Sequence, residues 1–552
     1  MKKYTQEAGW LEDGQMNRRS FLSLCAMGSL PVLLGACQSQ PGANTTTTPR
    51  AATATPRATS TPTAKPTPTR PPVLGEADWS NLGKSLQGTL IRPNNPQYAT
   101  AHQLFDPQFD GIKPAGVAYC ASPKDVQNCL SFVSRFNLPV TARSGGHSYG
   151  GYSTTTGLLL DVSRMNVITV DSGSGNATIG SGAKLIDVYA TLAQKGRVIP
   201  AGSCPTVGVA GLTLGGGVGV LGRKFGLTCD NLVSAQVVLA DGRIVTCNAN
   251  QNADLFWALR GGGGGNFGVV TSFTFQTHPV DSLAIFTLGW SWSDATAVVN
   301  SWQNWAPQAP DELWSNCLLL NTVDKSGTPR VLVNGVYVGG VDALNQQLQN
   351  LINKLGIAPT TRYASNSGLL DTMLYEAGCS NKTVSQCRLP SQSPQGQIER
   401  DSYAAKSDYI AKPLSTQAIN SLVNAITQYQ QSSTPGTGGI GMDAHGGAIN
   451  RVASDATAFA HRNMLFSIQY NANWDVGASD TVIAQNRAWL SNTWQSMRGY
   501  ASGSAYQNYI DPSLSNWQQA YYGTNLARLQ QVKATYDPKN LFHFKQSIPL
   551  PH

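Results

Sequence analysis

Two glycine-rich stretches decide how this sequence folds: Arg143-Ser-Gly-Gly-His-Ser-Tyr-Gly-Gly151 and Ala201-Gly-Ser-Cys-Pro-Thr-Val-Gly208. The second leads into a glycine tract, Gly211-Leu-Thr-Leu-Gly-Gly-Gly-Val-Gly219. Each stretch places a potential nucleophile, His147 or Cys204, in a loop where glycine lets the backbone approach a ligand closely. Rows of free backbone N–H groups in such loops make concave sites for phosphate. Together the two stretches predict a large phosphorylated cofactor held by covalent bonds.

The composition indicates a large folded protein with no special affinity for nucleic acid. The chain has 552 residues, of which 41% are hydrophobic and 13% charged, which is enough for two or three domains with buried cores. The formal net charge is +8, but much of this excess lies before residue 75. Basic runs with interleaved aromatic residues are absent from the sequence, as are zinc-type Cys-x-x-Cys pairs, so we expect neither a nucleic-acid surface nor a metal site.

The N-terminal residues carry features of an export signal. Asn17-Arg-Arg-Ser-Phe-Leu-Ser23 resembles a twin-arginine signal, although its flanking residues depart from the usual pattern. The apolar stretch that follows, 24–36, is too short for a stable membrane span but fits the hydrophobic region of a signal. Leu34-Gly-Ala-Cys37 resembles a bacterial lipobox, with Cys37 as the acylated residue; a plain secretory signal is the alternative. We expect an exported, extracytoplasmic protein, either attached to the membrane only by this lipid or secreted.

Changes in composition divide the chain into five segments. The signal occupies 1–37, and a disordered linker rich in Thr and Pro follows at 38–77, because such a segment cannot bury apolar area. We place a first folded domain at 78–280, a second domain at 281–500, and a distinct C-terminal segment at 501–552.

Export would carry the cysteines into a compartment where disulfides form. Ten cysteines are present, two of them in the signal. Three pairs are close in sequence: Cys379 with Cys387, Cys120 with Cys129, and Cys229 with Cys247. Spacing alone does not fix the connectivity. If all three pairs form, Cys204 and Cys317 are left over.

Local patterns predict mixed helices and strands in both domains. Ser122 and Pro123 begin a helix that runs to Phe136, because serine is a favoured N-cap and proline a favoured first residue. In the rest of the first domain we expect strands at 138–143, 158–162, 167–170, 177–180 and 269–276, a hairpin at 232–247, and helices at 183–196 and 254–260. Beyond it we expect strands such as 331–338 and 464–470, and helices such as 344–355, 415–430 and 525–536.

A nicotinamide-binding reading of the glycine tract is disfavoured. Gly217-Val-Gly-Val-Leu-Gly222 matches G-x-G-x-x-G, and Asp241 follows about twenty residues later. A Rossmann fingerprint, however, needs a buried strand directly before it and a helix directly after it. Here a long glycine run precedes the motif, and Arg223-Lys-Phe-Gly-Leu-Thr follows without a helical stripe.

Four motifs together resemble one family. They are Arg143 to Tyr149, Cys204 to Gly208, Leu255-Phe-Trp-Ala-Leu-Arg-Gly-Gly-Gly-Gly-Gly-Asn-Phe-Gly268, and Tyr521-Tyr-Gly-Thr-Asn-Leu-Ala-Arg-Leu529. In this order they resemble the berberine bridge enzyme-like oxidoreductases, from residue 78 to the C-terminus. The resemblance implies an α+β fold: a two-subdomain FAD-binding domain of p-cresol methylhydroxylase type, a substrate domain with an antiparallel sheet covered by helices, and a C-terminal segment that returns to the FAD domain.

The resemblance also implies how FAD is held. His147 matches the histidine that bonds the flavin 8α-methyl carbon, and Cys204 matches the cysteine that bonds flavin C6, so the cofactor would be bicovalent. Covalent bonds keep the flavin in place and tune its electronics, while its chemistry remains that of the cofactor. The further residues expected around FAD are Arg143, Ser144, Gly145, Gly146, Ser148, Val207, Gly208, Gly211, Gly215, Gly216, Gly219, Val270 and Asn525.

Catalysis by this resemblance requires a base beside flavin N5. Tyr509 matches the catalytic tyrosine, which removes the hydroxyl proton of an alcohol while hydride moves to N5. Its free pKa near 10 requires activation, and Asp511 is a carboxylate close by in sequence. Tyr149 would lie over the flavin. The residues expected to contact substrate are Tyr506, Ala448 and Asn450, the last replacing a glutamate base of plant members.

The expected activity is therefore that of an FAD-linked oxidase acting on CH–OH donors, with a sugar or oligosaccharide as substrate and tryptophans that either stack on sugars or fill the core. Val207 resembles the oxidases at the position that controls oxygen access, so oxygen would be the acceptor and hydrogen peroxide the product. The alternatives are a dehydrogenase of the same fold with another acceptor, a secondary-metabolite alcohol oxidase, and a non-enzymatic surface lipoprotein. We expect a monomer.

Overall fold

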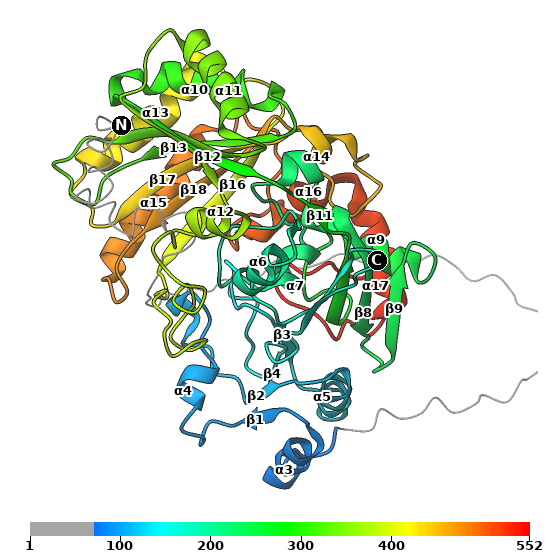
Figure 1. The fold of residues 1–552 in the computed structure, drawn as a ribbon. Coiled ribbons are helices and arrows are strands. Elements are labelled where there is room, and N and C mark those ends of the chain that lie inside the picture. Colours follow the sequence, from blue (N-terminus) through cyan, green and yellow to red (C-terminus); the bar gives the residue numbers. More distant parts are fainter. Residues whose placement is uncertain (1–70, 552) are drawn as a thin grey trace, which may run out of the picture.

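The computed structural model describes residues 71–551 (Figure 1). The predicted signal at 1–37, with its lipobox, and the linker up to residue 70 lie outside the described residues. Within 71–551, no helix is both long and apolar enough to cross a membrane.

The first subdomain is a small sheet with two helices. The sheet has the order β1 (Thr89–Ile91), β2 (Gly116–Tyr119), β4 (Leu158–Asp161), β3 (Val140–Arg143), and its last three strands are parallel. The helices are α3 (Glu76–Ser85) and α5 (Pro123–Phe136). As predicted, Ser122 caps α5, accepting the backbone N–H of Asp125 at 3.3 Å. The chain therefore enters the first glycine loop directly from the end of β3.

The second subdomain is antiparallel throughout. Its sheet has the order β5 (Ile168–Val170), β6 (Ala177–Gly180), β10 (Val269–Phe275), β8 (Leu232–Val238), β9 (Ile244–Asn248). Its helices are α6 (Leu185–Ala193), α7 (Val209–Leu214), α8 (Gly222–Phe225) and α9 (Ala253–Ala258). The glycine tract begins within α7, and the four-residue α8 follows it, so it lacks the strand–turn–helix of a Rossmann site.

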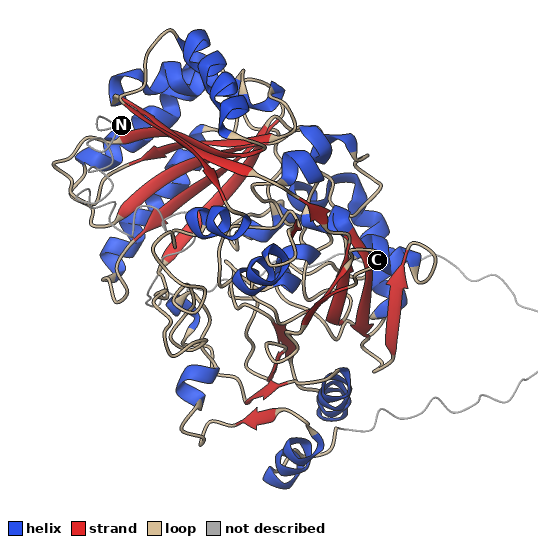
Figure 2. Ribbon diagram, viewed as in Figure 1, coloured by secondary structure: helices blue, strands red, loops and turns tan. Residues whose placement is uncertain are grey.

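The second domain is built on one seven-stranded antiparallel sheet (Figure 2). Its order is β15 (Thr361–Ser367), β12 (Leu283–Trp290), β14 (Arg330–Val338), β13 (Leu313–Leu320), β17 (Thr437–Ala444), β18 (Phe466–Asn473), β16 (Tyr403–Ile410). One face is covered by α10 (Ala295–Gln303), α11 (Val341–Leu355), α13 (Thr416–Gln431) and α15 (Asp480–Ser496) (Figure 1).

The two faces of this sheet differ in polarity because side chains alternate along each strand. On β18, Phe466, Ile468 and Tyr470 pack into the core beneath the helices. The residues between them, Gln469 and Asn471, are buried polar side chains on the opposite face. That polar face points toward the first domain and forms one wall of the candidate active site.

The C-terminal segment returns to the first domain, where α17 (Leu526–Tyr536) packs against α9. Lys533 of α17 is fully buried, and its ammonium group donates to the backbone carbonyl of Asn266 at 2.7 Å and to the Asp537 carboxylate at 2.6 Å. The fold therefore agrees with the predicted α+β architecture, and the predicted helices and strands are confirmed to within a few residues at their ends.

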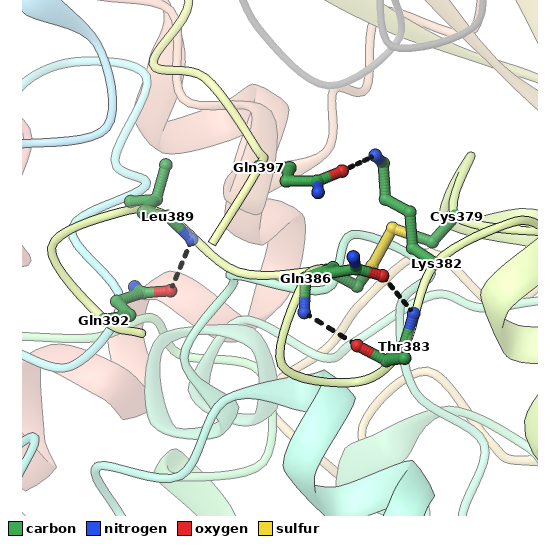
Figure 3. The surroundings of a disulfide bond; sticks show 8 residues. Cys379, Lys382, Thr383, Gln386, Leu389, Gln392 and Gln397 are labelled. Atoms are coloured by element: carbon green, nitrogen blue, oxygen red, sulfur yellow. Dashed lines mark hydrogen bonds between the residues drawn. A yellow bond between two sulfur atoms is a disulfide. The ribbon is translucent and has the colours of Figure 1, made fainter. Parts of the chain in front are cut away.

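One of the three candidate disulfides forms. A disulfide joins Cys379 and Cys387, whose Cα atoms are 6.0 Å apart. A hydrogen bond from Lys382 to Gln397 spans the same loop (Figure 3). The other two candidate pairs were wrong. Cys120 and Cys129 are neighbouring buried thiols, and Cys229 and Cys247 lie in different hydrophobic clusters. A short separation along the sequence was therefore not enough to bring the sulfur atoms of these two pairs into a disulfide.

Candidate active site

A cavity of about 340 Å³ lies between the two glycine loops and the polar face of the seven-stranded sheet. It brings together His147 and Cys204, which are 57 positions apart in the sequence, and the aromatic residues Tyr149, Tyr506 and Tyr509. Both domains and the C-terminal segment contribute to its walls. Five of the residues singled out from the sequence thus meet at one place.

The glycine loops pack against each other backbone to backbone. A Cβ on Gly145 would overlap the backbone of Gly208, and a Cβ on Gly208 would overlap the side chain of Ser144. Lys184 supports the first loop by donating to the Ser144 carbonyl at 2.6 Å. A Cβ on Gly211, by contrast, would meet open space in the cavity. This glycine-lined wall fits a long phosphorylated cofactor that is gripped through backbone N–H groups.

Arg143 contributes to this wall through its backbone, because its side chain is fully engaged elsewhere. The guanidinium forms an ion pair with Asp161 at 2.5 Å and donates to the carbonyl oxygens of Ala101 and Gln103 at 2.6 and 3.1 Å. These bonds anchor the start of the first glycine loop to the small parallel sheet. The side chain therefore holds the loop in shape.

His147 is held as a neutral imidazole. Its Nε2 lies 2.9 Å from the hydroxyl of Thr206, and its ring stacks on Phe105 with centroids 4.1 Å apart. Burial and, to a smaller extent, the positive charge of Lys184 lower the pKa of His147 to about 3. A neutral imidazole keeps a free electron pair and can act as a nucleophile.

Cys204 lines the same cavity, but its sulfur is disulfide-bonded in this structure. This corrects the expectation that Cys204 stays outside the disulfides. A thioether to a flavin would use the same sulfur atom, so the disulfide and the thioether exclude each other.

Three tyrosines and a glutamine form the centre of the site. The Tyr149 ring stacks on Tyr509, with centroids 5.4 Å apart, and the Tyr149 phenol accepts a hydrogen bond from Gln469 at 3.0 Å. The Tyr506 phenol accepts the backbone N–H groups of Gly217 and Val218 at 3.1 and 3.0 Å. Tyr506 therefore ties the C-terminal segment to the glycine tract, whereas Tyr509 presents its ring to the cavity.

Two buried carboxyl groups in the cavity were not anticipated from the sequence. They are Asp443 on β17 and Glu376 at the end of α12 (Leu369–Glu376). Burial raises the pKa of Asp443 to about 7. The pKa of Glu376 is raised to about 8 by burial and by the charge of Asp443. Burial, with Tyr149 and Asp443 nearby, also raises the pKa of Tyr509 well above its ordinary value. Asp443, rather than Asp511, is thus the carboxyl group whose charge raises the pKa of Tyr509.

Most of the remaining predicted residues line the cavity: Ser144, Gly146, Ser148, Val207, Gly219 and Val270. Five do not. Gly215 packs against Asn508, Gly216 packs against Phe459, and Asn525 donates to backbone carbonyls including that of Ser454. Asn450 and Ala448 both lie on the short helix α14 (Gly447–Arg451), and the Asn450 side-chain amide donates to the backbone carbonyl of Met464. These five residues lie outside the cavity lining, and their roles in binding stay predictions.

Asp511 and the tryptophans also have a structural explanation. The Asp511 carboxylate pairs with Lys406 at 2.7 Å and accepts from Ser513, which holds it away from Tyr509. Among the candidate tryptophans, Trp314 lines the cavity, whereas Trp302 and Trp474 are buried in the core under the helices.

A glycine-lined cradle that faces a buried phenol and carboxyl group defines a flavoprotein of the oxidoreductase class. Residues 114–248 match the FAD binding domain family, and residues 505–549 match the family described as berberine and berberine like. The chain is 35% identical over 469 residues to an uncharacterised FAD-linked oxidoreductase of Bacillus subtilis (strain 168), which covers 84% of this chain and 97% of that relative. The chain belongs to the berberine bridge enzyme-like family of FAD-linked oxidoreductases.

Solved structures agree with this assignment. Physcomitrella patens BBE-like 1 superimposes with a TM-score of 0.78 at 32% identity and covers 86% of this chain and 99% of its own. A chitooligosaccharide oxidase superimposes with a TM-score of 0.76 at 28% identity and covers 86% of this chain and 100% of its own. The protein is therefore an FAD-dependent enzyme, and both glycine loops lie within the residues that match the FAD binding domain family.

Proposed function

We propose that this protein oxidises a hydroxyl group of a sugar or oligosaccharide. The observation that carries the proposal is the position of Tyr509. Its phenol ring stacks on Tyr149 in the cavity, and the charge of the Asp443 carboxyl group helps to raise its pKa. The wall opposite the glycine loops is polar, and one similar structure is named as a chitooligosaccharide oxidase. A polyhydroxylated substrate is the chemical match for such a wall.

In the reaction we infer, Tyr509 receives the substrate's hydroxyl proton. A buried phenol whose pKa is raised is a poor base unless its own proton can leave. Asp443, with a pKa of about 7, can accept that proton near neutral pH. The bond from Gln469 keeps Tyr149 under Tyr509. Bound FAD supplies the acceptor for the hydride that departs from the same carbon.

We further infer that the flavin is attached to His147 and Cys204. The contact between Thr206 and His147 Nε2 leaves Nδ1 for the bond to the 8α-methyl carbon. The Cys204 sulfur would bond C6 once a cellular thiol reductant has opened its disulfide, and oxygen would take up the electron pair that each covalent bond leaves on the flavin. Acid precipitation tests this: yellow protein indicates covalent flavin, and peptide masses from His147→Ala and Cys204→Ala assign each bond. A colourless precipitate from the wild type would contradict covalent attachment.

Anaerobic mixing with a panel of sugars tests the activity. We expect the flavin absorbance to bleach with at least one sugar, and Tyr509→Phe to abolish bleaching while the flavin stays bound. Rapid bleaching by Tyr509→Phe would exclude Tyr509 as the base. Admitting oxygen then separates the proposed oxidase, which releases hydrogen peroxide, from a dehydrogenase, which needs a quinone or dye.

We also propose that the enzyme works outside the cytoplasm, anchored through Cys37 or secreted. The Cys379–Cys387 disulfide supports this proposal, because such bonds persist in oxidising compartments. Fractionation of the producing cell, with Cys37→Ala as the variant that removes the lipid site, tests it. Recovery of the wild type in the cytoplasm would contradict export.

A further inference from the structure

A row of polar side chains crosses the sheet beneath the cavity. The strand register aligns Thr287 on β12 with Asn334 on β14, Asn334 with Asn316 on β13, and Asn316 with Asp443 on β17. With strands about 4.8 Å apart, these four positions extend over roughly 14 Å. Asn334 donates to Asn316 at 3.3 Å. Asp443, at one end of the row, is the carboxyl group whose charge raises the pKa of Tyr509.

Helix α12 places Glu376 over this row. The hydroxyl groups of Tyr375, the preceding residue, and Thr287 form a hydrogen bond of 2.7 Å, which fixes the end of the helix on the sheet. Glu376 lines the cavity, and its Oε1 is buried with no hydrogen-bond partner among residues 71–551. Because a buried acceptor without a partner costs about 1–3 kcal/mol, this oxygen is suited to a group that a ligand brings.

Among residues 71–551, no positive charge compensates for the burial of Glu376. Glu376 and Asp443 of β17 interact with each other, and the other titratable groups near them are tyrosines. Tyr375 lies beside Glu376, and the charge of Asp443 raises the pKa of Tyr509 and of Tyr409. The basic residues that line the described cavity, Arg143, His147 and His543, all come from the FAD-binding side.

Two carboxyl groups that interact in such surroundings do not both ionise near neutral pH. The pKa of Glu376 is raised above that of Asp443. Burial and the charge of Asp443 therefore favour the neutral form of Glu376 near neutral pH.

We propose that Glu376 is a specificity residue that, as a neutral acid, hydrogen-bonds hydroxyl groups of the non-reacting part of a polyhydroxylated substrate lying along the row from Asp443 to Asn334. A neutral carboxyl group offers both a donor and an acceptor, as a sugar hydroxyl does. This inference rests on the proposed function and names the part of the site that selects the substrate.

Glu376→Gln and Glu376→Ala test the proposal in the full-length holoenzyme, with the exposed Glu399→Ala as control. Glutamine imitates the neutral acid, so with xylobiose or cellobiose at pH 7 we expect near-normal KM and kcat. Alanine should raise KM about tenfold, the loss of roughly one hydrogen bond, and leave kcat within about threefold. Equal damage by both substitutions, or an unchanged KM in Glu376→Ala, would overturn the proposal.

The pH dependence gives a readout that a packing defect would not produce. In the wild type KM should rise above about pH 8, where Glu376 ionises, and this rise should be absent in Glu376→Gln. A rise of the same size in Glu376→Gln would count against Glu376 as its source.

Binding without turnover separates this inference from the proposed activity. Enzyme reduced with dithionite under argon binds sugar without oxidising it, and its thermal unfolding temperature reports binding. We expect the sugar to raise this temperature in the wild type and Glu376→Gln but not in Glu376→Ala. If sugar binds with this pattern but never bleaches oxidised flavin, the proposed function fails and the role of Glu376 stands. If sugar does not bind the wild type, the role of Glu376 fails.

Discussion

The side-chain amide of Gln469 donates a hydrogen bond to the phenolic oxygen of Tyr149 at 3.0 Å, and this bond joins the two domains. Gln469 lies on β18 of the substrate-side sheet, whereas Tyr149 follows the glycine loop that carries His147. The Tyr149 ring is nearly parallel to Tyr509, with an angle of 12° between the planes. The same bond therefore positions the surface on which the proposed base rests.

Gln469→Leu should reduce kcat/KM for flavin reduction about tenfold, because one buried hydrogen bond is lost and Tyr149 is freed. Tyr149→Phe keeps the ring stacked on Tyr509 and removes the same bond from the other side. The double variant should then be hardly worse than either single variant. Stopped-flow bleaching under argon measures this, and fully additive losses would mean that the two residues act separately.

Asp443 should give the reaction a dependence on pH. Its ionised form is the one that accepts a proton, and its pKa is raised to about 7, so kcat/KM should increase with pH and level off above about pH 7. Asp443→Asn should lower the rate at least about a hundredfold and abolish the increase. Asp371→Asn, on an exposed residue of α12, is the control. A pH profile unchanged in Asp443→Asn would assign the titration to another group.

The parts of the site that were predictable from the sequence are the ones that local motifs specify. Because glycine loops constrain the chain at each position, the sequence alone predicted that His147, Cys204 and most of the glycine-lined wall belong to one site, and these residues do line one cavity. Tyr509 came with a short aromatic motif. The motif that contains Asn525 did not reveal that its side-chain amide donates to backbone carbonyls such as that of Ser454.

The substrate wall could not be predicted because it depends on strand order and register. Asn316, Asn334 and Asp443 come from three strands far apart in the sequence and meet only when β14, β13 and β17 pair. A local signal did exist: 466–473 alternates apolar and polar residues, which marks Gln469 as facing away from the core. The position of Glu376 follows from the packing of α12 and has no such signal.

Gly211→Ala should impair FAD loading without disturbing the fold. A Cβ at this position meets no atom of the protein within 4 Å, and Gly211 lines the cavity in which we propose that the cofactor binds. We expect a normal circular dichroism spectrum with a clearly reduced ratio of flavin to protein absorbance. Gly499→Ala, also in open space but away from the cavity, is the matched control. Full flavin occupancy in Gly211→Ala would place the cofactor elsewhere along the glycine wall.

Asp537→Ala should destabilise the protein strongly, because it leaves the Lys533 ammonium group buried without its counter-ion. Both side chains are completely buried, and Asp537 also accepts the backbone N–H groups of Leu541 and Phe542 at 2.8 and 2.9 Å. Removing one partner of such a pair costs about 3–5 kcal/mol. Calorimetry should show a markedly lower unfolding temperature.

The exposed Lys539→Ala, two residues along the chain from Asp537, should change the free energy of unfolding by less than about 0.5 kcal/mol. Replacing both partners, as Lys533→Met with Asp537→Leu, removes the unpaired charge and should recover part of the loss. Because Lys533 also binds the Asn266 carbonyl beside the glycine run 261–265, Asp537→Ala should loosen the C-terminal segment from the FAD domain. Proteolysis that releases this segment in Asp537→Ala but not in Lys539→Ala would support that role, whereas equal resistance would show that α17 is held by its apolar contacts alone.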